Sequence, residues 1–151
     1  MRYVLVKGGK LLQFITSPAM GVVNSDWFLQ PVANCRDRSG EIVIHKTDRP
    51  GIYRTEAGNS AKPLVYRIPV PEGTYRVRIH MADTFWKEDS GAEWKFGIGN
   101  DWRQFNIWKV AGGKGCTAVI TTFENVKPVD GAIKMEFPSG VANGIEIEKV
   151  K

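Results

Sequence analysis

The sequence predicts an all-β fold, an antiparallel sandwich or barrel, from three observations. Short extended runs follow one another at roughly 8–12-residue spacing, turn-forming residues separate them, and no long segment carries the 3.6-residue period of a helix. The chain has 151 residues, and no Pro/Ser-rich linker, repeat or low-complexity block divides it. We therefore expect a single domain over residues 1–151.

The first half of the chain contains six expected strands. They are Arg2–Val6, Leu11–Thr16, Glu41–His45, Tyr53–Glu56, Leu64–Pro69 and Thr74–Ala82. Gly8-Gly9 indicates a hairpin between the first two, and Pro71-Glu72-Gly73 has the chemistry of a tight turn between the last two. Residues 17–37 read as a long loop, of the kind that often forms one wall of a binding site.

The second half continues the pattern. Strands are expected at Glu93–Ile98, through Phe105 and Ile107, at Val119–Val126, at Ile133–Phe137 and at Ile145–Glu148. Gly99-Asn100-Asp101 is expected to turn the chain. The run Gly112-Gly113-Lys114-Gly115 lacks the spacing of a phosphate-binding loop, so we interpret it as a glycine-rich turn.

A pair of aromatic residues follows the expected strand Thr74–Ala82. From Tyr75 to Met81 the apolar residues fall on odd positions, and the polar ones, His80 among them, fall on even positions. This period of two predicts one face on the core and one in water. Phe85 and Trp86 then lie where the strand leaves the sheet, and they could either stack on a flat ligand or fold back onto the core or a protein interface.

Sugars are flat ligands of this kind. The apolar C–H faces of pyranose rings pack on aromatic side chains, and their hydroxyls need a few fixed polar partners. Polar residues in loops that flank the strands are candidates for those partners: Asp83, Glu56, Asn59 and Asn143.

Composition and charge exclude several other classes of function. The net charge is +5, but basic and acidic residues interleave, as in Arg36-Asp37-Arg38, so we expect a solvated surface and no nucleic-acid partner. No stretch approaches the roughly 20 apolar residues that a membrane span needs. Aromatic residues make up 11% of the chain, with five Trp, so at least one exposed ring is expected.

No catalytic centre or cofactor is expected. Neither His45 nor His80 lies in a nucleophile signature, and the pairs Glu88/Asp89 and Glu146/Glu148 read as solvated surface. No Cys/His spacing suggests a metal, although oxygen-rich loops leave a structural calcium ion as a weak alternative. These loops contain Asp26, Asp48, Asp83, Asp89 and Asp101.

The two cysteines and the N-terminus bear on the cellular compartment. Cys35 and Cys116 could form one disulfide in an oxidising compartment or remain two buried thiols. No signal peptide follows Met1, which predicts an intracellular protein if Met1 is the natural start.

Five groups of residues, in order, resemble the landmarks of the malectin domain. They are Gly51–Glu56, Tyr66–Tyr75, Ile79–Asp83, Phe105–Trp108 with Gly112-Gly113, and Ile133–Phe137 with Gly140, Asn143 and Ile145–Ile147. This resemblance implies a jelly-roll β-sandwich of the galactose-binding-like type. It also implies non-catalytic binding of an oligosaccharide or glycan through loops at one end, with the aromatic pair in the site. The predicted carbohydrate-binding residues are Phe85, Trp86, Asp83, Glu56, Asn143 and Tyr53.

Three positions differ from the family pattern. Ala57-Gly58 stand where the family has a tyrosine, Ala142 stands where it has a binding aspartate, and Trp27 or Phe28 replaces an N-terminal tyrosine. These differences support an alternative in which the chain is a malectin-fold interaction or scaffolding subunit of a larger complex that has lost sugar binding.

Overall fold

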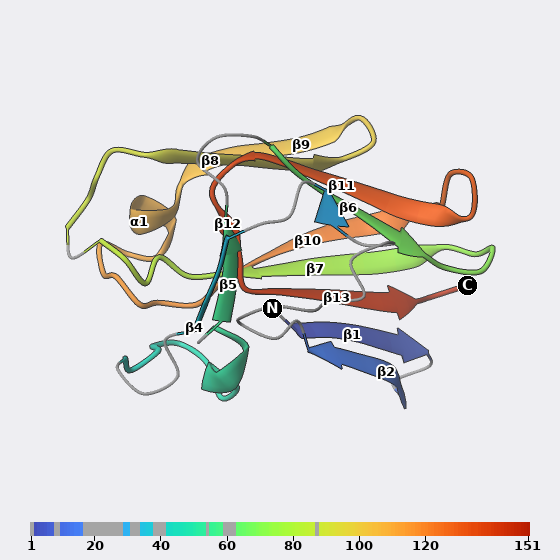
Figure 1. The fold of residues 1–151 in the computed structure, drawn as a ribbon, viewed down its shortest axis with the longest axis horizontal. Helices are drawn as coiled ribbons and strands as arrows, with labels where there is room; N and C mark the ends of the chain where they lie inside the picture. Colours follow the sequence, from blue (N-terminus) through green and yellow to red (C-terminus); the bar gives the residue numbers. More distant parts are fainter. Residues whose placement is uncertain are drawn as a thin grey trace.

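The described part of the chain folds into three β-sheets (Figure 1). The computed structural model describes residues 2–7, 10–16, 29–30, 34–37, 42–53, 55–58, 63–86 and 88–151. One five-stranded sheet has the order β10 (Val119–Val126), β7 (Tyr75–Met81), β13 (Gly144–Lys149), β1 (Arg2–Lys7) and β2 (Lys10–Thr16). The other has the order β3 (Leu29–Gln30), β6 (Leu64–Pro69), β11 (Ala132–Ser139), β8 (Glu93–Ile98) and β9 (Asp101–Asn106). A three-stranded sheet contains β12 (Val141–Ala142), β5 (Thr55–Gly58) and β4 (Asn34–Asp37).

The two larger sheets enclose the main hydrophobic core. On β7 the side chains of Tyr75, Val77, Ile79 and Met81 are at most 1% exposed, which confirms the alternation in the sequence. Phe96 of β8 joins the two sheets, because its ring lies 6.2 Å from that of Phe123 on β10. The architecture confirms the predicted all-β sandwich.

Among the named strands of the described residues, every pair is antiparallel except β1 with β13. β1 and β13 pair in parallel, in a register that sets Arg2 beside Gly144 and Lys7 beside Lys149. β1 and β2 pair antiparallel, as the expected hairpin requires, although its Gly8-Gly9 turn lies outside the described residues. The observed β6, β8 and β10 have the predicted bounds.

One predicted strand is wrong, one ends earlier than expected, at Asn106 of β9, and one begins later. Within Ile42–His45, His45 alone forms an isolated bridge, with Thr117, because the segment packs Ile44 into a small separate cluster instead of joining a sheet. Ile107 starts the helix α1 (Ile107–Val110), since the Asn106 side chain accepts a hydrogen bond from the Lys109 N–H and caps it.

The expected strand Tyr53–Glu56 is displaced. Tyr53 ends the 3₁₀ turn η1 (Pro50–Ile52), donating its N–H to the Pro50 carbonyl, and β5 begins at Thr55.

The polar face of β7 is also more covered than its sequence predicts. His80 is 2% exposed and the Glu146 side chain 13%, because the segment 42–53 lies over this part of the sheet and brings the Tyr53 hydroxyl to within 2.9 Å of His80 Nδ1. The interpretation of Glu146 as solvated surface is therefore wrong. Among the described residues, no helix is long and apolar enough to cross a membrane.

Candidate functional site

The aromatic pair lies at one end of the sandwich, which we call the loop end. It is formed by residues 82–86, the helix α1 and residues 111–118, at the left of Figure 1. The other end, which we call the hairpin end, contains the β8–β9 turn and the last residues of β10. The register of β7 and β10 separates the two ends, because Val119 pairs with Met81 and Val126 with Tyr75.

Phe85 and Trp86, the ring pair, are exposed at the loop end. Their side chains are 53% and 50% exposed, and the two rings meet edge to face with centroids 4.9 Å apart and planes at 85°. Asp83 fixes the backbone that carries them, since its Oδ1 accepts hydrogen bonds of 3.0 Å from both the Phe85 and the Trp86 N–H. The Asp83 carbonyl in turn accepts the Cys116 N–H at 2.8 Å. The ring pair is thus presented on a turn that is tied to the neighbouring loop.

Asn143 joins three segments behind this turn and is fully buried. Its Oδ1 accepts the Ala82 N–H at 2.7 Å, and its Nδ2 donates to the Tyr53 carbonyl at 3.2 Å. Its own N–H donates to the His80 carbonyl at 2.9 Å. The last residues of β7 are therefore held to both the start of β13 and the segment that precedes β5.

The remaining predicted site residues also lie inside the protein. Glu56 is 5% exposed and accepts a 2.8 Å hydrogen bond from Thr84 Oγ1, immediately before the ring pair. Tyr53 is 1% exposed, and Asp83 is 7% exposed. Of the six predicted residues, the structure thus exposes the two rings and places the four polar side chains beneath or behind them. Asn59 lies outside the described residues.

A buried row of polar groups runs from Tyr53 through His80 to Glu146. His80 Nε2 lies 3.2 Å from Glu146 Oε2, which completes the chain of contacts that starts at the Tyr53 hydroxyl. Burial lowers the pKa of His80 below its ordinary value, and the hydrogen bond to Glu146 opposes that shift. Burial also raises the pKa of Tyr53 to about 12. Both side chains are therefore neutral near pH 7 and support the fold.

Trp108 is an aromatic residue of the loop end that was not among the predicted site residues. It lies on α1, is half-buried, and packs its ring against the glycine-rich turn that follows. Gly112 and Gly113, both with positive φ, close that turn by donating their N–H groups to the Lys109 and Trp108 carbonyls. The glycine-rich turn was predicted, and an aromatic residue just before such a run was the available signal for Trp108.

The structure offers little for metal binding in its described part. No group of three or more His, Cys, Asp or Glu side chains there has the proximity of a metal site. Cys116 is half-buried beside the small cluster of Ile44, Ile52 and Ala82. The side chain of Cys35, and Asp26, Trp27 and Phe28, lie outside the described part of the molecule.

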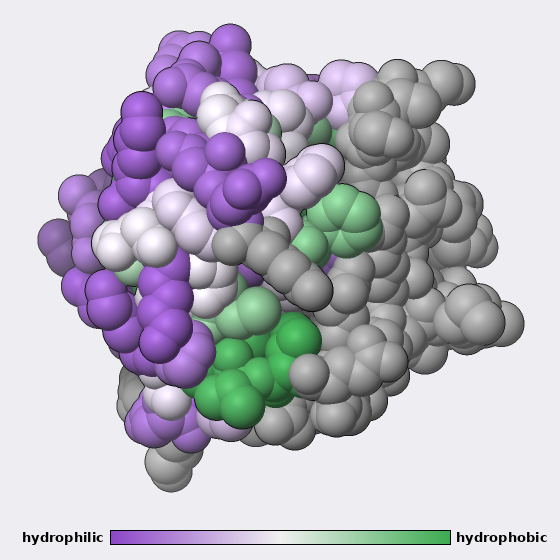
Figure 2. All heavy atoms as spheres, turned by 90° about the vertical axis from the view of Figure 1, so that its left-hand side faces the viewer, coloured by the Kyte–Doolittle hydropathy of each residue, from purple (hydrophilic) through white to green (hydrophobic). Residues whose placement is uncertain are grey.

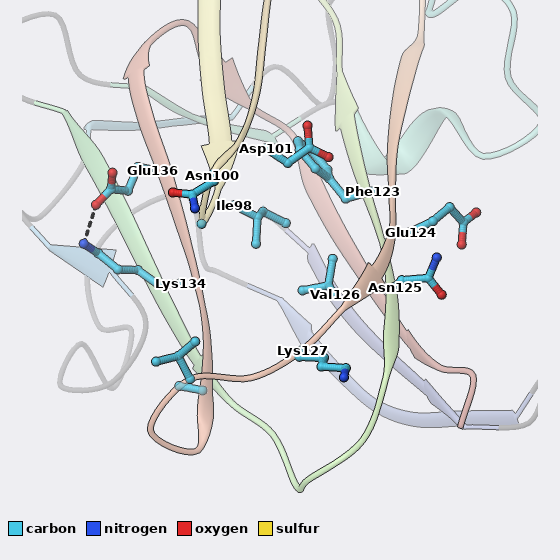
Figure 3. Close-up of a pocket in the computed structure, with 13 residues that line it drawn as sticks. Ile98, Asn100, Asp101, Phe123, Glu124, Asn125, Val126, Lys127, Lys134 and Glu136 are labelled. Atoms are coloured by element: carbon cyan, nitrogen blue, oxygen red, sulfur yellow. Dashed lines mark ion pairs between the residues drawn. The ribbon is translucent and has the colours of Figure 1, made fainter.

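A cavity of about 490 Å³ lies at the hairpin end, away from the ring pair (Figure 3). Ile98 and Val126 point toward one another across it. Its three carboxylates each pair with a basic side chain: Glu136 with Lys134, Glu124 with Arg76, and Asp101 with Arg103. The cavity therefore has an apolar floor and a rim of acids that are already neutralised.

The surface of the loop end is mixed in character. Figure 2 shows this face, with a hydrophobic patch low on it beside hydrophilic surface. In segment 42–53, Val43 is 72% exposed.

Comparison with known families identifies the fold. The malectin domain profile matches residues 20–150. The chain belongs to the malectin domain family. Malectin-like domains are generally non-catalytic binding modules, which supports a carbohydrate-binding or interaction module in this chain too. Among curated proteins, no sequence matches.

Solved structures resemble this malectin domain over most of its length. The ANXUR1 extracellular domain from Arabidopsis thaliana is 15% identical with a TM-score of 0.65, and the match covers 80% of this chain and 39% of that one. The ANX2 ectodomain from the same plant is 18% identical with a TM-score of 0.58, covering 93% and 44%. A Bacteroides uniformis β-glucuronidase is 16% identical with a TM-score of 0.61, covering 80% and 14%. At these identities the likeness shows the fold alone, and the chain spans about a seventh of the glucuronidase and two fifths of the receptor ectodomains.

Proposed function

We propose that this malectin domain binds an oligosaccharide or glycan without catalysis, with residues 1–151 acting as one module. The observation that carries the proposal is the ring pair, two adjacent aromatic side chains that are both about half exposed on a turn held by Asp83. Large exposed aromatic rings that the protein fixes in place are the surface on which a pyranose ring packs.

The backbone turn that carries the rings is held in place by the protein itself, which favours binding. Ordering flexible side chains and loops costs free energy on association, and a preformed surface avoids part of that cost. Here the buried Asn143, the Thr84–Glu56 hydrogen bond and the Cys116–Asp83 backbone bond all hold the segment that carries the rings. We therefore assign Asp83, Glu56, Asn143 and Tyr53 to the support of the ring pair, and Phe85 and Trp86 to contact with the sugar.

The test is isothermal titration of the domain with glucose-, galactose- and xylose-based oligosaccharides. We expect weak binding of at least one of them, because a shallow site gains little beyond one or two stacked rings. Trp86→Ala should weaken it by about tenfold or more, since a stacking ring is lost.

Trp102→Ala provides the matched control. Trp102 is 39% exposed on β9, where its ring lies over Gly97 with Lys95 Nζ 5.5 Å from the ring centroid, so it is a surface tryptophan outside the loop end. Equal affinity of both variants would contradict the proposed site, and the absence of binding to every oligosaccharide would contradict the proposed function.

One observation favours the alternative of an interaction or scaffolding subunit. Val43, in the segment 42–53 that precedes β5, is more exposed than either ring of the pair, and the face shown in Figure 2 carries a hydrophobic patch. Apolar side chains gathered on one face are common at protein interfaces. This function predicts that Val43→Ser and Trp86→Ala both weaken assembly with a protein partner while no oligosaccharide binds.

A further inference from the structure

The hydroxyls of a sugar on the ring pair need hydrogen-bond partners at the loop end. Of the residues predicted for that task, Asp83, Glu56 and Asn143 already make hydrogen bonds within the protein, through Asp83 Oδ1, Glu56 Oε2 and both ends of the Asn143 amide, while Asn59 lies outside the described residues. The hydroxyl of Tyr53, the other predicted polar site residue, is bonded to His80. Partners are therefore to be sought among other side chains near the rings.

Trp108 approaches the ring-pair segment across a single glycine. A Cβ atom at Gly115 would lie 3.0 Å from Trp108 Cζ3 and 3.1 Å from the Trp86 carbonyl oxygen. Both distances are tighter than almost all real Cβ contacts, so glycine is the residue that allows the indole and the Trp86 backbone to come this close. The two tryptophans thus lie close together at the loop end, although Trp108 is on α1 and Trp86 is on the turn that follows β7.

The position of Trp108 is fixed from both sides. At the start of α1, Asn106 accepts the Lys109 N–H through Oδ1 and donates through Nδ2 to Asp89 Oδ1 at 2.8 Å. At its end, the Gly113 N–H donates to the Trp108 carbonyl at 2.9 Å. The indole is therefore presented by a backbone that is held at both ends of the helix.

The indole N–H of Trp108 is available to a ligand. Among the described residues, the Trp108 N–H has no hydrogen-bond partner. This N–H is not among the described side-chain N and O atoms that are both fully buried and without a partner, so it is accessible to water. A Cβ atom at Gly113 would lie 4.0 Å from Nε1, so glycine at this position keeps a side chain away from the N–H. An indole offers both an apolar ring and one donor, which suits a ligand with apolar faces and hydroxyl groups.

We propose that Trp108 is a further, specificity-determining residue of the carbohydrate site. Its Nε1–H donates a hydrogen bond to a hydroxyl of the sugar that stacks on the ring pair. The ligand class is a neutral oligosaccharide with a hydroxyl beside its stacked face. This inference rests on the proposed function.

The first test uses the oligosaccharide that binds best to the wild-type domain. Trp108→Phe keeps an aromatic ring but removes the donor together with one ring of the indole, so affinity should fall by at least the roughly three- to tenfold expected for one neutral hydrogen bond. Trp102→Phe makes the same chemical change outside the loop end and should leave affinity unchanged.

The second test is direct. In ¹H–¹⁵N spectra, the indole N–H signal of Trp108, assigned from its loss in Trp108→Phe, should shift on titration with that oligosaccharide, whereas that of Trp102 should not. If the Trp86 signal shifts and that of Trp108 does not, the role of Trp108 is overturned while the proposed function stands. If no tryptophan signal shifts with any oligosaccharide, both are overturned.

Discussion

The two ends of the sandwich use polar residues in opposite ways. At the loop end the polar side chains behind the ring pair are buried and bond mainly to backbone groups, as Asn143 and Asp83 do, while the two aromatic rings face the solvent. At the hairpin end the charged side chains are exposed and pair with one another around an open cavity, as Arg103 and Asp101 do. An exposed ion pair contributes only about 0–1 kcal/mol to the free energy of unfolding. Removing one partner of a buried hydrogen bond lowers that free energy by more, because the remaining polar group is left buried and unpaired.

This difference indicates which end is built to present a surface. At the loop end, buried polar groups hold the backbone turn that carries the two rings, whereas at the hairpin end exposed charged side chains pair with one another at the surface. A binding site for a rigid, weakly held ligand gains from the first arrangement, because preorganisation reduces the cost of association. Two predictions separate the two ends, and a third tests the buried polar groups behind the ring pair.

The largest expected effect is on stability. Asn143→Ala should lower the free energy of unfolding by about 2–4 kcal/mol, because it leaves the buried Ala82 N–H and Tyr53 carbonyl without their partner. Asn100→Ala, the same change in the exposed β8–β9 turn, should alter it by less than about 0.5 kcal/mol. Urea unfolding followed by circular dichroism measures both. Equal losses would remove the distinction between the ends.

A smaller effect is expected on ligand binding from Asp83. Asp83→Ala removes the acceptor for the Phe85 and Trp86 N–H groups, so the ring pair loses its fixed turn and oligosaccharide affinity should fall about three- to tenfold. Asp83→Asn keeps an acceptor oxygen and should bind nearly as the wild type does.

Calorimetric titration distinguishes support from direct contact at Asp83. If the carboxylate charge itself oriented the sugar, Asp83→Asn would bind as weakly as Asp83→Ala. Asp101→Ala, the matched change at the hairpin end, should leave affinity unchanged.

The smallest effect is a dependence of stability on pH. Burial lowers the pKa of His80 in the folded protein below its ordinary value of about 6.5. Because the folded protein holds His80 in its neutral form, the stabilisation from His80 is fully present above the ordinary pKa. It is lost as the pH falls through the lowered pKa of the folded state. The melting temperature of the wild type should therefore decrease more between pH 7.5 and pH 5 than that of His80→Gln. Parallel decreases in the two proteins would show that His80 does not carry the effect.

Much of the sandwich could be predicted because its signals are local. Alternating residues between clear turns set the bounds of β6, β8 and β10. The same signal was wrong at Ile42–His45, where alternating apolar residues pack against Ile52 and Tyr53 and not against a neighbouring strand. At Ile107 the alternation continues, but the Asn106 cap starts a helix.

The ring pair was located by its place after a strand, which is also a local signal. The roles of the residues around it depend on partners far away in the chain. Asn143 bonds to Ala82 across 61 positions, and Thr84 bonds to Glu56 across 28. The spacing of residues along the sequence gives no sign of either pairing. The sequence could therefore identify these side chains as candidates, but it could not show that they face inward.

The parallel pairing of β1 with β13 has a practical consequence for handling the domain. It sets Arg2 beside Gly144, next to Asn143 and the loop end, and lets β13 run away toward the opposite end, where the C-terminus is seen in Figure 1. A tag or linker attached after Lys151 would therefore anchor the domain to a sensor chip with Phe85 and Trp86 directed into solution. Anchoring through the first residues would instead bring the solid support toward the side of the molecule where those rings lie.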